Sequence, residues 1–195
     1  MQRPVAYDCL TLWRLREPGA LGTRSSILMQ AKLATLGDLF GFSVWIPAQD
    51  RAAVVEVAPE RCRAALLQSL PLCADPGTLT TVANIYVIWL RGGAIVRAFE
   101  VEHTTSIYSG LLRTADLLAL QPNLRIALHI VAGAERRAKV RAQIVRPAFS
   151  MIEGGPLRSV CSFLAYEAID EMLTHPQLKR MRDSLVEDYA EFFEV

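Results

Sequence analysis

Two glutamates, Glu100 and Glu102, lie two residues apart in a strand-like segment that runs directly into the hydroxyl-rich segment 104–109. Because side chains alternate between the two faces of a strand, both carboxylates point to the same side. We expect that side to be buried, since apolar residues flank the pair: Ile95, Phe99 and Val101. Buried like charges need a cation between them, and Mg²⁺ would bind there through oxygen ligands and retained waters. An edge strand carrying two solvated glutamates fits the pattern equally well, so both interpretations stay open.

The composition is that of an ordinary globular chain. Its 195 residues are 52% hydrophobic and 21% charged, which is enough for one domain with a sizeable core. We expect residues 25–195 to form a single domain and the segment 1–24, interrupted by Pro18-Gly19 and Gly22, to have no clear pattern of its own. This N-terminal segment could dock the chain into a larger complex. The formal net charge is only +1, so any nucleic-acid-binding surface has to be a local patch.

The spacing of the cysteines and the length of the apolar stretches indicate the cellular compartment of the protein. The four cysteines are far apart, form no CxxC pair and are predicted to be small buried hydrophobes in a reducing compartment: Cys9, Cys62, Cys73 and Cys161. No stretch approaches the ~18 apolar residues that span a bilayer, and the N-terminus has no signal-peptide pattern. The sequence therefore predicts a cytoplasmic protein with no membrane partner.

Helical and strand-like patterns alternate along the chain. The first helix is expected from Ser25, with Gly41 as its left-handed cap. A β-hairpin is expected around Gly92-Gly93, with strands 85–90 and 94–102. The other predicted elements are strand 42–46, helix 59–69, helix 106–120, a central strand 124–131, helix 135–146, strand 160–164, and helices 166–173 and 177–193. This order predicts an α/β fold with a mixed central sheet flanked by helices.

Several short motifs lie between residues 28 and 170. The most specific is Phe-Glu-Val-Glu at 99–102, followed by Thr-Thr-Ser-Ile-Tyr-Ser-Gly-Leu-Leu-Arg at 104–113. The others are Leu36-Gly37, Gly41 to Ile46, Asp50-Arg51, Ile85 to Leu90, Asp116-Leu117, Gln121 to Leu124, Glu135 to Arg137 and Arg146 to Phe149. Together these motifs resemble the restriction-endonuclease-like, PD-(D/E)XK nuclease superfamily, and within it a bacterial group with the same central block.

This resemblance implies a restriction-endonuclease-like fold and a DNA substrate. In such nucleases an acid on the first hairpin strand and an acidic pair on the second hold one or two Mg²⁺ or Mn²⁺ ions, which activate water against a phosphodiester bond. By the same resemblance Glu100 would be a metal ligand, and Glu102, at a position that is commonly lysine, a ligand or the base that orients the water. Many of these nucleases act as dimers, so a homodimer is expected.

One position departs from the family pattern. The first acid of the family falls at Tyr86, whose neutral phenol is a poor ligand for Mg²⁺. Two side chains are possible substitutes: Asn84, which is expected to share a strand face with Tyr86 at a distance of about 6–7 Å, and Asp50, if its loop folds over the site. Loss of one acid would weaken the metal site and could stop cleavage.

Basic residues gather on the helix expected at 135–146, namely Arg136, Arg137, Lys139 and Arg141, and Arg113 follows the acidic strand. Given the resemblance, we expect them to contact DNA phosphates, although a solvated helix face is the commoner explanation of a charge run. Two hypotheses follow. The first is a Mg²⁺-dependent DNA endonuclease acting in phage defence or DNA repair. The alternative is a catalytically impaired homologue that binds DNA or serves as a subunit of a complex.

Overall fold

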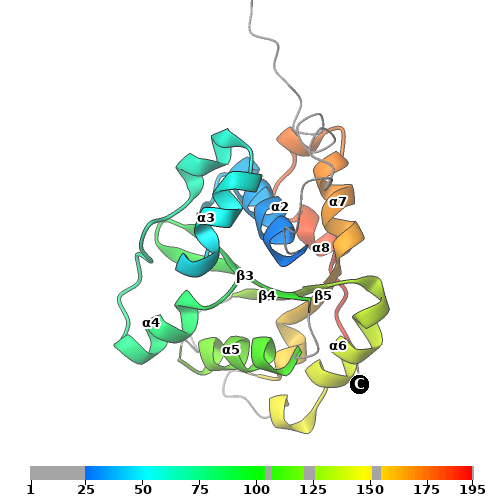
Figure 1. The fold of residues 1–195 in the computed structure, drawn as a ribbon. Coiled ribbons are helices and arrows are strands. Elements are labelled where there is room, and N and C mark those ends of the chain that lie inside the picture. Colours follow the sequence, from blue (N-terminus) through cyan, green and yellow to red (C-terminus); the bar gives the residue numbers. More distant parts are fainter. Residues whose placement is uncertain (1–24, 104–106, 121–125, 151–154, 195) are drawn as a thin grey trace, which may run out of the picture.

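A five-stranded mixed sheet runs through the middle of the molecule, with helices on both faces (Figure 1). The computed structural model describes residues 25–103, 107–120, 126–150 and 155–194. The strands follow one another across the sheet in chain order: β1 (Ser43–Trp45), β2 (Val87–Arg91), β3 (Ala94–Glu102), β4 (Ala127–Ala132) and β5 (Cys161–Ala165). Strands β1 to β3 pair antiparallel, and β3 to β5 pair parallel. The predicted α/β fold with a mixed sheet is confirmed.

The hairpin of β2 and β3 turns at Gly92 and Gly93, whose φ angles are +58° and +83°. Glycine has no Cβ and adopts this left-handed backbone without strain, so the two-residue turn fits the sequence. From this turn, β3 runs through the centre of the sheet between β2 and β4. A β-bulge shifts the register between the pairs Leu90–Ile95 and Trp89–Arg97, so the turn and the bulge together set which way the side chains of β3 point.

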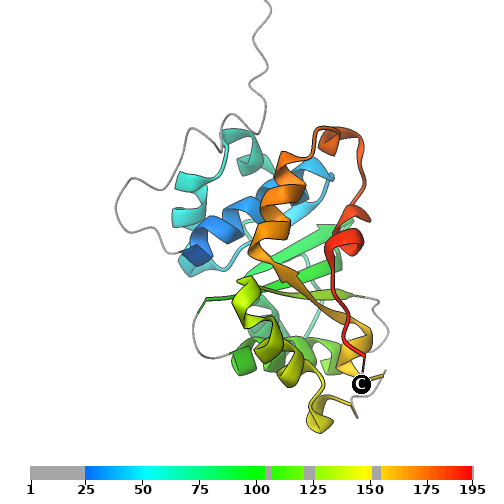
Figure 2. The same ribbon diagram turned by 90° about the vertical axis from the view of Figure 1, so that its right-hand side faces the viewer.

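The two faces of the sheet bury separate cores. On one face, α2 (Ser25–Leu39), α3 (Ala48–Val57), α7 (Tyr166–Thr174) and α8 (Leu185–Tyr189) cover Phe99 and Val101 of β3. On the other face, α4 (Pro76–Ala83), α5 (Ile107–Leu120) and α6 (Arg137–Ile144) cover a second apolar cluster that includes Ala98. Figure 2 shows the same two layers from the side. None of the described helices is long and apolar enough to cross a membrane.

Some predicted elements differ from the observed ones. The helix expected at 59–69 is a short 3₁₀ helix (Glu60–Ala65), and the one expected at 177–193 is broken into a 3₁₀ turn (Leu178–Arg180) and α8. Helix α3 was not predicted because Val54 is its one fully buried residue, which leaves no apolar stripe to detect. Helix α4 was missed although Asp75 caps it and Pro76 opens it. Cys62 and Cys161 are buried as expected, but Cys73 is exposed, and Cys9 lies outside the described residues.

A buried charged network lies on the α2 face of the sheet. Arg97 of β3, only 4% exposed, binds Asp183 Oδ2 at 3.0 Å and Glu187 Oε1 at 2.6 Å, which ties the α8 segment to the sheet. Arg97 Nη1 also donates to His129 Nε2 at 3.3 Å. Since an arginine can only donate, the imidazole is neutral and its Nδ1–H donates to Ser162 Oγ at 2.7 Å. His129 is therefore a hydrogen-bonded core histidine.

His129 should make the protein sensitive to acid. Burial, and then the charge of Arg97, lower the pKa of His129 from 6.5 to about 3. Because the pKa of His129 is lower in the folded protein than in the unfolded chain, the neutral imidazole contributes to the free energy of unfolding above pH 6.5. This contribution is lost as the pH falls below 6.5. From pH 7 to pH 5 the loss should be about 2 kcal/mol. Urea unfolding at both pH values should show a loss larger by that amount than in His129→Asn; equal losses would contradict the assignment.

Candidate functional site

Glu100 and Glu102 lie near the carboxyl end of β3, on the face covered by α5. Glu100 is 0% exposed and Glu102 is 4% exposed, so the edge-strand interpretation with solvated glutamates is wrong. Phe99 and Val101 pack on the opposite face, and both faces of β3 are buried. The strand is parallel to β4, which is parallel to β5, and ligands of α/β sheets commonly bind beyond the carboxyl ends of such strands.

Gly110 lets helix α5 approach the two glutamates closely. A Cβ atom at this position would overlap Glu102 Oε1 and would lie 3.3 Å from Glu100 Cβ. The sequence analysis did not single out this residue. A glycine in the interior of a helix lowers helix stability by about 1 kcal/mol relative to alanine. Its presence in the predicted helix indicates a position where another segment packs too closely for a side chain.

Arg113, also on α5, holds both carboxylate oxygens of Glu100. Its Nε donates to Oε1 at 2.9 Å and its Nη2 donates to Oε2 at 2.7 Å, which is a two-point ion pair. Burial raises the pKa of Glu100 to about 7, against the hydrogen bonds and charge of Arg113, and the negative charge of Glu102 adds to the rise. The hydrogen bond to Glu100 raises the pKa of Arg113, so this residue stays charged.

Three strand ends meet at Glu102. Tyr166, the first residue of α7 after β5, donates its hydroxyl to the backbone oxygen of Glu102 at 3.0 Å. Arg136, which follows β4, donates from Nη1 to the same oxygen at 3.4 Å. Burial raises the pKa of the Glu102 carboxyl, while the charges of Arg113, Arg136 and Lys139 oppose the rise. The sequence analysis missed Tyr166, because only the parallel pairing of the sheet brings it to Glu102.

Tyr86 lies beside the acidic pair. The guanidinium of Arg113 stands 5.8 Å from the centre of its ring. Burial and the negative charge of Glu100 raise the pKa of the Tyr86 phenol, so it is neutral and protonated at physiological pH. The expected strand at 85–90 begins only at Val87, so the prediction that Asn84 shares a strand face with Tyr86 is wrong. Asn84 is instead an exposed residue at the end of α4 and donates its amide to Thr80 O at 2.8 Å.

Asp50 comes from the other layer of the molecule. It lies in the first turn of α3, where Gln30 Nε2 of α2 donates to its Oδ2 at 3.0 Å. Gln30 is fully buried, and its Oε1 has no hydrogen-bond partner among the described residues. The charge of Asp50 is a minor contribution to the raised pKa of Tyr86. Its role as a substitute ligand stays a prediction.

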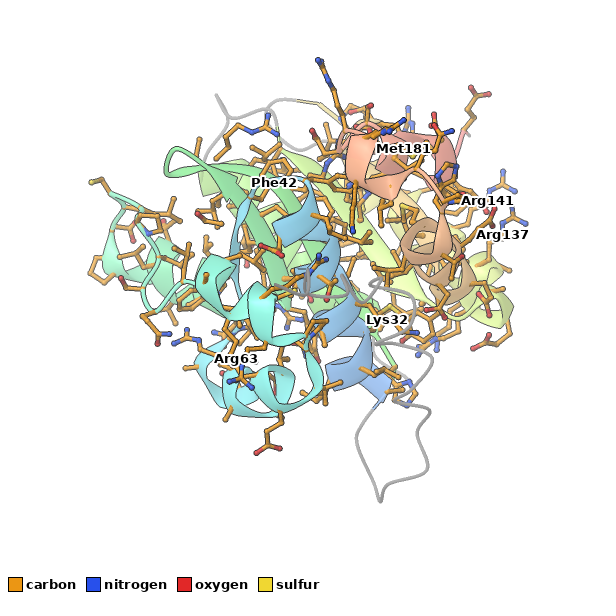
Figure 3. All side chains as sticks on the ribbon, turned by 90° about the horizontal axis from the view of Figure 1, so that it is seen from above. Lys32, Phe42, Arg63, Arg137, Arg141 and Met181 are labelled. Atoms are coloured by element: carbon orange, nitrogen blue, oxygen red, sulfur yellow. The ribbon has the colours of Figure 1, made fainter. Side chains whose placement is uncertain are left out.

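The basic residues of the α6 region divide into two groups. Arg136 and Lys139 are close enough to Glu102 to lower the pKa of its carboxyl. Arg137 and Arg141 interact with the C-terminal segment: Arg137 Nε donates to Glu191 Oε2 at 2.6 Å, and Arg141 Nη2 donates to Glu194 O at 3.3 Å. Figure 3 shows Arg137 and Arg141 next to each other at one edge of the molecule. One face of the helix therefore belongs to the acidic site and the other does not.

The donor set suits a hydrated divalent ion. Among the described residues, no group of three or more histidine, cysteine, aspartate or glutamate side chains is arranged to hold a metal ion. Mg²⁺ in proteins commonly uses one or two carboxylates and completes its shell with waters and substrate phosphates. Glu100 and Glu102 supply that minimum, and each oxygen of Glu100 keeps one lone pair beyond its bond to Arg113. The two residues therefore fit such an ion.

Comparison with known proteins gives the class to which this chain belongs. Residues 21–193 match the family described as the Type II restriction enzyme NmeDI C-terminal domain, and the chain belongs to that family. It is 29% identical over 177 residues to the Type II restriction enzyme NmeDI of Neisseria meningitidis serogroup C. The match covers 86% of this chain and 48% of the relative, so the chain spans about half the length of that enzyme. No solved structure gives a significant match.

The ion pair of Glu100 and Arg113 should respond unequally to loss of its two partners. Arg113→Leu leaves the fully buried carboxylate unpaired and should cost about 3 kcal/mol or more. Glu100→Gln keeps one hydrogen-bond acceptor, and Arg113, 26% exposed, can reach water, so this change should cost about 1 kcal/mol. Urea unfolding at pH 8 measures both values, and similar costs would contradict the assigned burial of the pair.

Proposed function

We propose that this chain is a metal-dependent DNA endonuclease domain of the PD-(D/E)XK type. The observation that carries the proposal is a pair of buried carboxylates, Glu100 and Glu102, at the carboxyl end of β3, approached by three cationic side chains: Arg113, Arg136 and Lys139. Negative oxygens suit a divalent metal, and the surrounding cations suit the phosphates of DNA. Membership of a restriction-enzyme family supports DNA as the substrate.

Each side chain has a role in this proposal. Glu100 and Glu102 would hold Mg²⁺ or Mn²⁺, which when bound would lower the pKa of water and stabilise charge on the scissile phosphate. Glu102, whose pKa burial raises, can also accept the proton of the attacking water. Arg136 and Lys139 position the phosphate, and Tyr166 fixes the end of β3 through the backbone oxygen of Glu102. Cutting both strands of a duplex suits a homodimer, and a restriction activity suits phage defence.

A second candidate function is supported by Tyr86. This neutral residue stands at the position where the resemblance expects an acid, and it lies against the guanidinium that already holds Glu100. The chain would then be a catalytically impaired homologue that binds DNA through its basic residues without cutting it.

Plasmid cleavage with Mg²⁺ or Mn²⁺ separates the two functions. The natural chain should nick or linearise plasmid, and Glu100→Gln should abolish cutting, because it removes a charged ligand. Tyr86→Asp should raise the cleavage rate at least tenfold by adding a third carboxylate. If the natural chain is silent and Tyr86→Asp cuts, the impaired homologue is the correct function. Silence in both would contradict the nuclease assignment.

The division of the basic residues predicts which of them bind DNA. Arg136→Gln with Lys139→Gln should weaken duplex binding about tenfold and reduce the slope of log K against log salt by one or two, because phosphate contacts release counterions. The matched control is Arg137→Gln with Arg141→Gln, which removes the same charge from the α6 region but on the side of the C-terminal segment. Fluorescence anisotropy over a salt series measures both. Equal losses in the two double variants would contradict the division.

A further inference from the structure

The contact between Arg113 and Glu100 places a positive charge where the proposed metal ion has to bind. The two nitrogens of Arg113 take one lone pair from each oxygen of Glu100. A divalent cation that coordinates the same carboxylate meets both a partly used donor and a like charge beside it. Since burial strengthens electrostatic interactions, this competition is stronger than it would be at a solvated carboxylate.

The two partners differ in their freedom to move. Glu100 is 0% exposed on the central strand and is packed against Gly110, so its carboxylate has little room to turn. The Arg113 side chain is 26% exposed, on a helix at the rim of the site. Any rearrangement that separates the pair therefore has to move the guanidinium and leave the carboxylate in place.

DNA would provide a second partner for that guanidinium. The planar fork of an arginine binds a phosphate in the same two-point manner as a carboxylate, and the proposed substrate brings phosphates to this site. Arg113 can exchange one such partner for the other and remain paired throughout. The exchange would free the lone pairs of Glu100 at the moment when the phosphate also becomes available as a metal ligand.

We propose that Arg113 is a positioning residue that keeps Glu100 from binding metal until a DNA phosphate draws its guanidinium away. This proposal rests on the proposed function, since it takes Glu100 as a ligand. It implies that DNA and metal bind cooperatively, because each favours the state in which Arg113 has left Glu100. Without DNA, the natural chain then binds metal weakly.

Mn²⁺ binding in the absence of DNA tests the proposal. Free Mn²⁺ is measured by electron paramagnetic resonance under argon at several pH values from 7 to 9 for the natural chain, Arg113→Gln, Arg113→Lys and the double variant Arg113→Gln with Glu100→Gln. Affinities are compared where they no longer rise with pH, because loss of Arg113 also raises the pKa of Glu100. Arg113→Gln should bind Mn²⁺ about tenfold more tightly than the natural chain. Arg113→Lys, which keeps the charge but cannot hold both oxygens in a fork, should fall between them. The double variant should lose the gain.

Mn²⁺ binding and plasmid cleavage together separate a wrong role for Arg113 from a wrong nuclease function. A merely structural role for Arg113 would lower Mn²⁺ affinity in Arg113→Gln, and equal or lower affinity overturns the proposal. If the natural chain nonetheless cleaves plasmid, the nuclease function stands and only the role of Arg113 is wrong. If no variant binds Mn²⁺ and none cleaves, both are wrong. Should circular dichroism show that Arg113→Gln is unfolded, Arg113→Lys decides, and an affinity no higher than that of the natural chain overturns the proposal.

Discussion

The acidic site depends on one constraint: two carboxylates that share a buried strand face have to be neutralised by the residues around them. Hydration cannot stabilise these charges, because Glu100 is fully buried and Glu102 is nearly so. The chain meets the constraint with Arg113, whose fork takes both oxygens of Glu100, and with the charges of Arg136 and Lys139 near Glu102. The apolar packing of α5 and of the α6 region on the sheet brings cations from both to the same strand end.

The central strand carries buried charge on both of its faces. On the α2 face, Arg97 is held by Asp183 and Glu187, which anchor the C-terminal segment. That segment then pairs Glu191 with Phe163 at the edge of β5 and reaches α6, where Glu191 binds Arg137. The opposite face holds the acidic pair. A strand of nine residues thus connects an anchoring network with the acidic pair, separated by the thickness of a single sheet.

Local features of this fold were predictable, and contacts between distant segments were not. The pair Gly92-Gly93 specifies the hairpin turn, and the alternation of β3 places Glu100 and Glu102 on one face, so both could be predicted from neighbouring residues alone. The partners of those glutamates come from other elements. Tyr166 and Arg136 reach Glu102 only because β3, β4 and β5 are parallel neighbours in the sheet. The order of strands in a sheet cannot be predicted from the sequence of any single strand. The burial of the two glutamates could not be predicted from β3 either, because it depends on the packing of helix α5 against them.

Tyr86 decides how much negative charge the site can offer a metal ion. With an acid at that position the site would carry three carboxylates beside the guanidinium of Arg113 and the nearby charges of Arg136 and Lys139. With a neutral phenol it carries two, and Arg113 offsets one of them. The remaining attraction for a divalent ion is therefore small until a phosphate brings further negative charge and engages the arginine. Loss of the acid and the presence of Arg113 thus act in the same direction. Under the proposed function, both would make metal binding depend on DNA and would limit hydrolysis to the moment when a substrate is in place.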